Sequence, residues 1–219
     1  LMLAGAQFVA TWVLRDEGAV TILFAALIAP ALLMAPVWQK VADRIGKERG
    51  FRIASVLYLV AATVLVGMVW APGWWVVLPV GVAGAAYAGM QTLPMAMLPD
   101  VIAYDSWVRG RQTTTEGARS GIFGGVWTAG ETTGMALGST ALTIMLAVTG
   151  YIESTANMNV EQPALAVTGI ALSFSLLPAA LMLLSLFTLR RYGLRESDLA
   201  ATEAGPEAGT TATDNPGDS

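Results

Sequence analysis

Five long apolar runs limit what this chain can fold into more than any other feature. A helix needs about 20 apolar residues to cross the ~30 Å hydrocarbon core of a bilayer. Runs of that length occupy residues 20–38, 53–71, 74–98, 121–148 and 166–189. A further apolar run at residues 1–14 is too short to span at the helical rise, and we interpret it as a helix whose first part is missing. We therefore predict an all-α membrane protein and expect the chain to be the C-terminal piece of a longer one.

Composition supports the membrane assignment and removes several kinds of chemistry. The chain is 55% hydrophobic and only 13% charged, whereas a soluble domain carries about 25% charged residues. It has no Cys, which excludes disulfides and thiolate metal sites. It also has no His, which removes the usual general base and the commonest metal ligand. We predict no catalytic residue, no metal site and no bound cofactor.

The cations alternate between the two sides of the predicted membrane. Only Arg15 lies on one side, and the rest of the 12 Lys and Arg residues follow the second, fourth and sixth runs, the short run being the first. These clusters are Lys40, Arg44, Lys47, Arg49 and Arg52; Arg109, Arg111 and Arg119; and Arg190, Arg191 and Arg195. The positive-inside rule places them in the cytoplasm. We predict a multi-pass protein of the cell inner (plasma) membrane with a cytoplasmic C-terminus.

The end of the chain differs from the rest in composition. From residue 196 onwards it contains acids but no Lys or Arg, and no apolar periodicity. We predict a six-helix transmembrane bundle over residues 1–192 and a disordered, acidic cytoplasmic tail over residues 193–219.

The connection after the second run carries the motif Asp43-Arg44-Ile45-Gly46-Lys47. It resembles the loop signature of the major facilitator superfamily, an Asp-Arg-x-Gly-Arg/Lys core. Gly46 permits a tight turn into the next helix, and Asp43 can face a helix N-terminus and Arg44. The superfamily usually has Gly four residues before that Asp, where this chain has Gln39.

The connection after the fourth run narrows the resemblance. Pro94 to Asp105, with Asp100 and Tyr104, precedes the pairs Gly110-Arg111 and Glu116-Gly117. This pattern resembles the glycoside–pentoside–hexuronide:cation symporters, the melibiose permease family, and the likeness covers residues 38–151. It implies that the chain is spans seven to twelve of a major facilitator fold, with the seventh truncated and the N-terminal six-helix half missing.

The resemblance also implies what the chain carries and what it lacks. The family's cation-binding acids lie in the missing half, so a coupling ion (Na⁺ or H⁺) has no site on this chain. Two departures concern the solute: Thr113 to Thr115 lengthen the cytoplasmic motif, and Glu131 to Thr133 stand where the family often carries a Lys. We expect Asp43, Arg44, Asp100, Asp105 and Arg111 to form gating ion pairs in cytoplasmic loops, or else to be merely solvated.

Glu131 is the ionisable residue predicted at the greatest depth. Counted from Arg119 at the helical rise, it lies roughly 18 Å into its helix, where a charge costs about 2.5–3.5 kcal/mol. Trp127 and Thr128 share its face. A ring beside a carboxylate suits a polyol, since the ring covers C–H faces and the acid accepts hydroxyl hydrogen bonds. A proton carrier or a structural acid paired with another helix are the alternatives.

Other polar residues in the runs are weaker candidates. We expect Thr132, and Gln91 just before Pro94, to line the same solute path, although Gln91 could instead cap backbone carbonyls freed by the proline. Gln7 and Trp12 are further candidates. Glycines at 130, 134 and 138 recur every fourth residue, which predicts close packing against a neighbouring helix rather than a site.

These observations favour a secondary transporter of a small polar solute, a sugar or glycoside, working by alternating access. The alternatives are a lipid or lysolipid transporter of the same fold and a non-transporting membrane scaffold. An intramembrane protease is disfavoured because the chain lacks a Gly-x-Gly-Asp partner for Asp105 and any His for a serine or metalloprotease site. We expect lipid, the solute and the missing half as partners, and no nucleic acid.

Overall fold

The computed structural model describes residues 2–16, 18–108, 116–153 and 161–189, and these contain helices and turns but no strand. The elements are α1 (Met2–Phe8), the π-helix η1 (Val9–Val13), α2 (Ala19–Ile45), α3 (Lys47–Leu65), the 3₁₀ helices η2 (Val66–Val69) and η3 (Trp74–Val76), α4 (Val77–Val108), α5 (Glu116–Val148), α6 (Ala164–Phe174) and α7 (Leu176–Leu189). The predicted all-α fold is confirmed.

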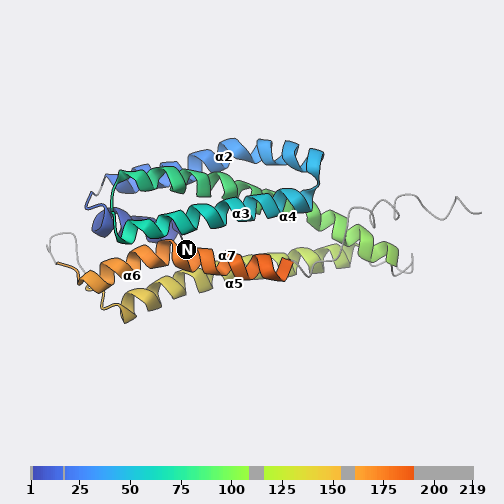
Figure 1. The fold of residues 1–219 in the computed structure, drawn as a ribbon. Helices are drawn as coiled ribbons and strands as arrows, with labels where there is room; N and C mark the ends of the chain where they lie inside the picture. Colours follow the sequence, from blue (N-terminus) through green and yellow to red (C-terminus); the bar gives the residue numbers. More distant parts are fainter. Residues whose placement is uncertain (1, 17, 109–115, 154–160, 190–219) are drawn as a thin grey trace, which may run out of the picture.

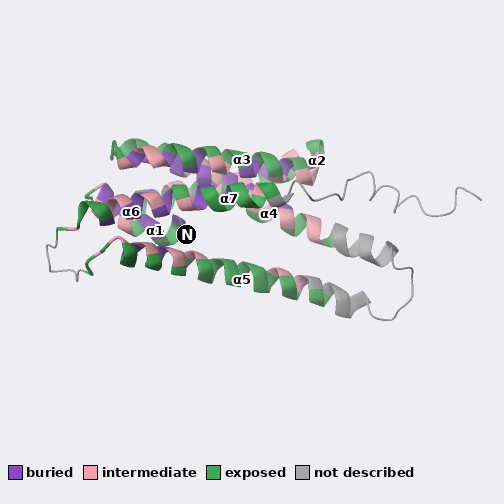
Figure 2. Ribbon diagram, turned by 60° about the horizontal axis from the view of Figure 1, so that its bottom comes forward, coloured by how far each residue is buried: buried purple, intermediate pink, exposed green. Residues whose placement is uncertain are grey.

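The long helices lie lengthwise in one bundle (Figure 1). Helix α4 packs against both α2 and α3, α3 also contacts α7, and α1 packs against α6 and α2. Helix α5 lies at the margin, where it contacts α6 and meets α4 and α1 less extensively. Figure 2 shows the consequence: most of α5 is exposed, whereas the other helices bury one face against their neighbours.

Four helical segments are long and apolar enough to cross a membrane. They are Ala19–Ile45, Lys47–Val69, Trp74–Pro99 and Ala164–Phe187, which correspond to four of the five predicted spans. The short run at Met2–Val13 falls below spanning length, as expected. The predicted span at residues 121–148 is different. It forms α5, which has 33 residues, but its Gly, Ser, Thr and Glu131 content leaves it outside the apolar set among the described residues.

The last span is broken between α6 and α7. Ser175 separates the two helices, and its hydroxyl donates to the Ala171 carbonyl at 2.7 Å. Pro178 has no N–H to offer the carbonyl of Phe174, four residues earlier. This loss explains why one apolar run forms two helices that still serve as a single span.

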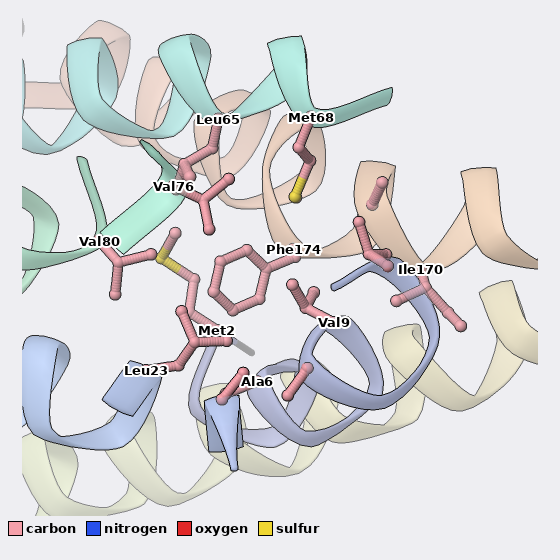
Figure 3. Close-up of a cluster of buried hydrophobic side chains, with 14 of the residues drawn as sticks. Met2, Ala6, Val9, Leu23, Leu65, Met68, Val76, Val80, Ile170 and Phe174 are labelled. Atoms are coloured by element: carbon pink, nitrogen blue, oxygen red, sulfur yellow. The ribbon is translucent and has the colours of Figure 1, made fainter. Parts of the chain in front are cut away.

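The main core gathers at one end of the bundle around Phe174 (Figure 3). Side chains from several segments of the chain meet there, and those labelled in the close-up are Met2, Ala6, Val9, Leu23, Leu65, Met68, Val76, Val80, Ile170 and Phe174. Because α1, α2, α3, α4 and α6 all contribute, the short first helix is built into the core. A second cluster, of Trp38, Ala42, Ala54, Ala88 and Leu93, joins α2, α3 and α4.

Small residues let α4 approach α2 closely. A Cβ added to Gly84 would overlap the Leu27 carbonyl oxygen, and one added to Gly89 would lie 2.7 Å from the Trp38 ring. The Trp38 indole N–H donates to the Ala85 carbonyl at 2.7 Å. The glycines that permit this close approach are therefore in α4, whereas α2 has Gln39 where the superfamily usually has Gly.

Helix α4 continues further than the sequence predicted. It has 32 residues, or roughly 48 Å at the helical rise, and so exceeds the ~30 Å hydrocarbon core. The segment from Pro99 to Asp105, which lies beyond the predicted run and which we expected in a cytoplasmic loop, is helical. Prolines 94 and 99 lie inside this helix without ending it. Asp100 and Asp105 therefore lie on a helix projecting from the bundle and not in a loop.

The turn between α2 and α3 has the predicted glycine. Gly46 has φ 90° and ψ 147°, a backbone conformation open almost only to glycine, and it caps α2 by donating to the Ala42 carbonyl at 2.9 Å. We expect Gly46→Ala to destabilise the protein by about 1–3 kcal/mol, because the strain falls on the folded state alone. Thermal unfolding in detergent measures this cost. Arg49→Ala, at an exposed position in the next turn, is the control, and an equal loss in both variants would contradict the assignment.

Candidate functional site

The predicted site residues Gln91 and Glu131 lie together. The Gln91 Nε2 atom donates to Glu131 Oε1 at 2.8 Å, which joins α4 to α5 across 40 residues of sequence. Both side chains are exposed in this chain. In the described residues no cation lies within ion-pair distance of Glu131, so its partner is a neutral amide. The alternative in which Gln91 caps a carbonyl freed by Pro94 is not what the structure shows.

Three further polar residues, Trp127, Thr128 and Thr132, lie on the same side of α5 as Glu131. The indole nitrogen of Trp127, one turn before Glu131, is shielded from solvent yet has no hydrogen-bond partner. Buried N–H groups are nearly always paired, so this donor is unusual. Within the described residues, the hydroxyls of Thr128 and Thr132 make no hydrogen bond either. We call Gln91, Trp127, Thr128, Glu131 and Thr132 the polar face.

The free hydroxyls of the polar face differ from those further along α5. Thr140 donates to the Ala136 carbonyl at 2.8 Å, and Thr143 to the Ser139 carbonyl at 3.1 Å. Such back-bonding satisfies a hydroxyl within its own helix. Thr128 and Thr132 lack it and keep both donor and acceptor capacity for another molecule. The unsatisfied groups of α5 therefore gather around Glu131.

Two glycines of the predicted α5 stripe do not pack within this chain. A Cβ added to Gly130 or Gly134 would meet nothing within 4 Å. The prediction that these glycines touch a neighbouring helix is therefore wrong for the described residues. The physical reason is the marginal position of α5, which leaves this part of the helix without a neighbour.

The weaker candidates Gln7 and Trp12 lie in α1 and η1, respectively. Trp12 donates from its indole nitrogen to the Tyr151 hydroxyl at 3.2 Å, and the two rings meet edge to face at 6.2 Å. Phe8 packs against the same tyrosine with ring centroids 5.5 Å apart. Gln7 is exposed. The structure does not bring Gln7 or Trp12 to the polar face.

Two of the predicted gating residues, Asp43 and Arg44, lie at the end of α2, just before the turn into α3. Asp43 and Arg44 are both exposed, and neither forms an ion pair with a described residue. The side chains of Asp100 and Asp105, and the whole of Arg111, lie outside the described residues. Gating by these residues therefore stays a prediction.

One cross-helix contact at this junction was missed from the sequence. Lys47 donates from Nζ to the Ala96 carbonyl at 3.1 Å, bridging α3 and the extended end of α4. Ala96 lies near the end of the predicted run 74–98, and no sequence pattern connected it with Lys47. The contact depends on the unusual length of α4, which only the structure shows.

Comparison with known proteins agrees with this architecture. Residues 1–196 match the family model described as MFS/sugar transport protein, which covers most of the chain. A search of curated proteins found no match. Members of this family are transporters and not enzymes, which removes the protease alternative. The chain therefore belongs to the MFS/sugar transport family of the major facilitator superfamily and is a membrane-embedded sugar transporter.

Proposed function

We propose that this chain is the C-terminal half of a cation-coupled symporter for a small neutral glycoside. The proposal rests on one observation above all, the set of unsatisfied polar groups on α5 around the Gln91–Glu131 hydrogen bond. In alternating access, two six-helix halves rock about a solute site near the middle of the membrane. The polar face would form this half's wall of that site.

Exposing the polar face to lipid would be unfavourable in free energy, and this supports its position on a solute path. Exposed on a helix in hydrocarbon, Glu131 would cost about 2.5–3.5 kcal/mol when charged, and the threonine hydroxyls would add to that. Ionisable residues in membranes accordingly face a water-filled cavity or another protein. Four residues of the polar face, Gln91, Thr128, Glu131 and Thr132, are exposed in this chain, so the proposed N-terminal half would cover them and enclose a hydrated path between the two.

The surroundings of the polar face support the same arrangement. Ile122 and Val126 on α5 are 63% and 68% exposed, and the open glycines 130 and 134 would admit the close approach of another helix. Large apolar side chains beside small residues are typical of helix–helix contacts in membranes. An N-terminal half packed there would give the glycine stripe the neighbour that this chain does not supply.

The chemistry of the polar face suits sugar hydroxyls. Gln91 engages Oε1 of Glu131, which orients the carboxylate and leaves Oε2 to accept from the solute. The hydroxyls of Thr128 and Thr132 can both donate and accept, and the half-buried ring of Trp127 beside them can cover C–H faces of the sugar. Because the only charge among these groups is negative, we expect neutral glycosides to be favoured over uronides, whose carboxylate would be repelled.

Uptake into proteoliposomes containing the full-length gene product tests the proposed function. We expect accumulation of a labelled neutral glycoside that depends on an imposed Na⁺ or H⁺ gradient. Equilibration without accumulation would leave a sugar transporter but refute symport. Uptake of a lysolipid with no uptake of any glycoside would favour the lipid alternative, and uptake of neither would favour a scaffold.

Competition by charged sugars tests the expected selectivity. A uronide should inhibit neutral glycoside uptake at least about tenfold more weakly than its neutral counterpart, since a buried like-charge contact costs more than the ~1.4 kcal/mol that a factor of ten represents. In the Glu131→Gln protein, the uronide and its neutral counterpart should inhibit uptake to a similar extent. Equal inhibition by both sugars in the wild-type protein would contradict the proposed contact with Glu131.

A further inference from the structure

A cavity lies at the end of the bundle opposite the cation-rich turn between α2 and α3. Its volume is about 360 Å³, and its walls come from η1 and the residues after it, η2, the turn before η3, and α6. Figure 1 shows these segments meeting at one end of the molecule. None of the described lining residues belongs to α4 or α5, so this cavity is separate from the polar face.

Arg15 supplies the positive charge of the cavity wall. In the described part of the chain it forms no ion pair and no side-chain hydrogen bond. The neighbouring Asp16 is already engaged, because its Oδ1 accepts from the Gly18 N–H at 2.8 Å at the start of α2. The guanidinium is therefore left with its donors available at the edge of the cavity.

The backbone that carries Arg15 is unusual in two ways. Arg15 has φ 55°, and within the described residues it is the one non-glycine with positive φ. It also lies two residues after the end of the π-helix η1, a conformation found often at functional sites. Strained conformations of this kind persist where the surroundings or a ligand hold them. At Arg15 the chain turns from η1 towards α2, and Arg15 lies on the cavity wall.

Aromatic residues place this cavity at the level of the lipid headgroups. Trp12 and Trp74 line it, and Trp70 beside it is 78% exposed. Tryptophans gather at the membrane–water interface, where one side of the ring is apolar and the N–H reaches polar groups. An arginine fork among them matches the two oxygens of a phosphodiester, which it binds bidentately.

We propose that this cavity binds the phosphate group of an acidic phospholipid in the leaflet opposite the cation-rich loops. Arg15 engages the phosphate oxygens, and the indoles of Trp12 and Trp74 flank the glycerol region. A lipid source is favoured over free phosphate because one cation stands among mostly apolar wall residues, which fits a headgroup joined to acyl chains. Bound lipid would hold the turn between η1 and α2 and thereby steady the first helix of this half.

The experiment compares the thermal stability of the full-length protein in nanodiscs of phosphatidylcholine with and without phosphatidylglycerol. We expect phosphatidylglycerol to raise the Tm, and we expect Arg15→Gln to remove most of that rise. Arg15→Gly relieves the backbone strain as well as removing the charge, so it should raise the basal Tm but still lose the phosphatidylglycerol effect. In a lipid titration, both variants should bind phosphatidylglycerol at least about tenfold more weakly than the wild-type protein.

Controls separate this site from other anion contacts. Arg49→Gln removes an exposed cation from the opposite face and should keep the Arg15-dependent part of the Tm shift. Millimolar inorganic phosphate should neither reproduce the shift nor displace the lipid. A shift that survives in both Arg15 variants would overturn the proposal, and so would phosphate alone giving the full effect, because the site would then take a free anion.

Discussion

Replacing Glu131 by Gln will lower glycoside uptake at least tenfold while leaving the amount of inserted protein unchanged. The amide keeps the size of the side chain and can still bond to Gln91, but it no longer offers a charged acceptor to the solute. A hydrogen bond to a charged group contributes about 1.5–3 kcal/mol, equivalent to roughly 10–150-fold in affinity. Uptake of labelled glycoside at low concentration measures the loss.

The matched control for this substitution is Glu161→Gln. Glu161 is an exposed acid in the connection before α6, far along the chain from the polar face, and it loses the same charge. Its uptake should stay within about twofold of wild type, because surface charges away from a site contribute little. If Glu131→Gln also stayed within twofold, Glu131 would be a structural acid and the polar face would not be the solute site.

Replacing Gly84 by Ala will cause the largest loss of folded protein among single-methyl additions. The new Cβ would overlap the carbonyl oxygen of Leu27, a backbone atom that can move only if α2 and α4 separate. Overpacking of this kind costs about 1–3 kcal/mol and more where backbone must shift. We expect a markedly lower Tm in detergent and a lower yield of monodisperse protein.

Gly121→Ala is the corresponding control, since a Cβ at Gly121 would meet nothing within 4 Å. Alanine favours the helix over glycine by about 1 kcal/mol, so this variant should be as stable as wild type or slightly more so. Similar Tm values for Gly84→Ala and Gly121→Ala would show that α2 and α4 do not approach as closely as the structure has them.

The sequence predicted most of the helices because their signals are local. Apolar run length identified four spans that the structure confirms, and the short run before Leu14 was recognised as too short. Gly46 was expected at a tight turn and has the positive φ that such a turn requires. Each of these depends on residues close together in the chain, where hydrophobicity and backbone preference act directly.

What the sequence could not show depends on packing between distant segments. The extension of α4 beyond Leu98 and the marginal position of α5 follow from which helices touch. The glycines of α5 have the same spacing whether or not a neighbour is present, so their pattern could not reveal an open face. Gln91 and Glu131 were both chosen as polar residues in apolar surroundings, but the hydrogen bond between them arises from the register of α4 against α5.

Protection of a single thiol by the sugar tests the central claim most directly, because it reports contact at the polar face without depending on coupling. The chain has no native Cys, so Thr128→Cys gives it a single thiol on that face, once any Cys elsewhere in the full-length protein is replaced. Thr143→Cys, on the same helix but beyond the polar face, is the reference. We predict that a saturating neutral glycoside slows maleimide labelling of Thr128→Cys several-fold and leaves Thr143→Cys unchanged. Equal labelling rates with and without the sugar at both positions would contradict the assignment of the polar face as the sugar site.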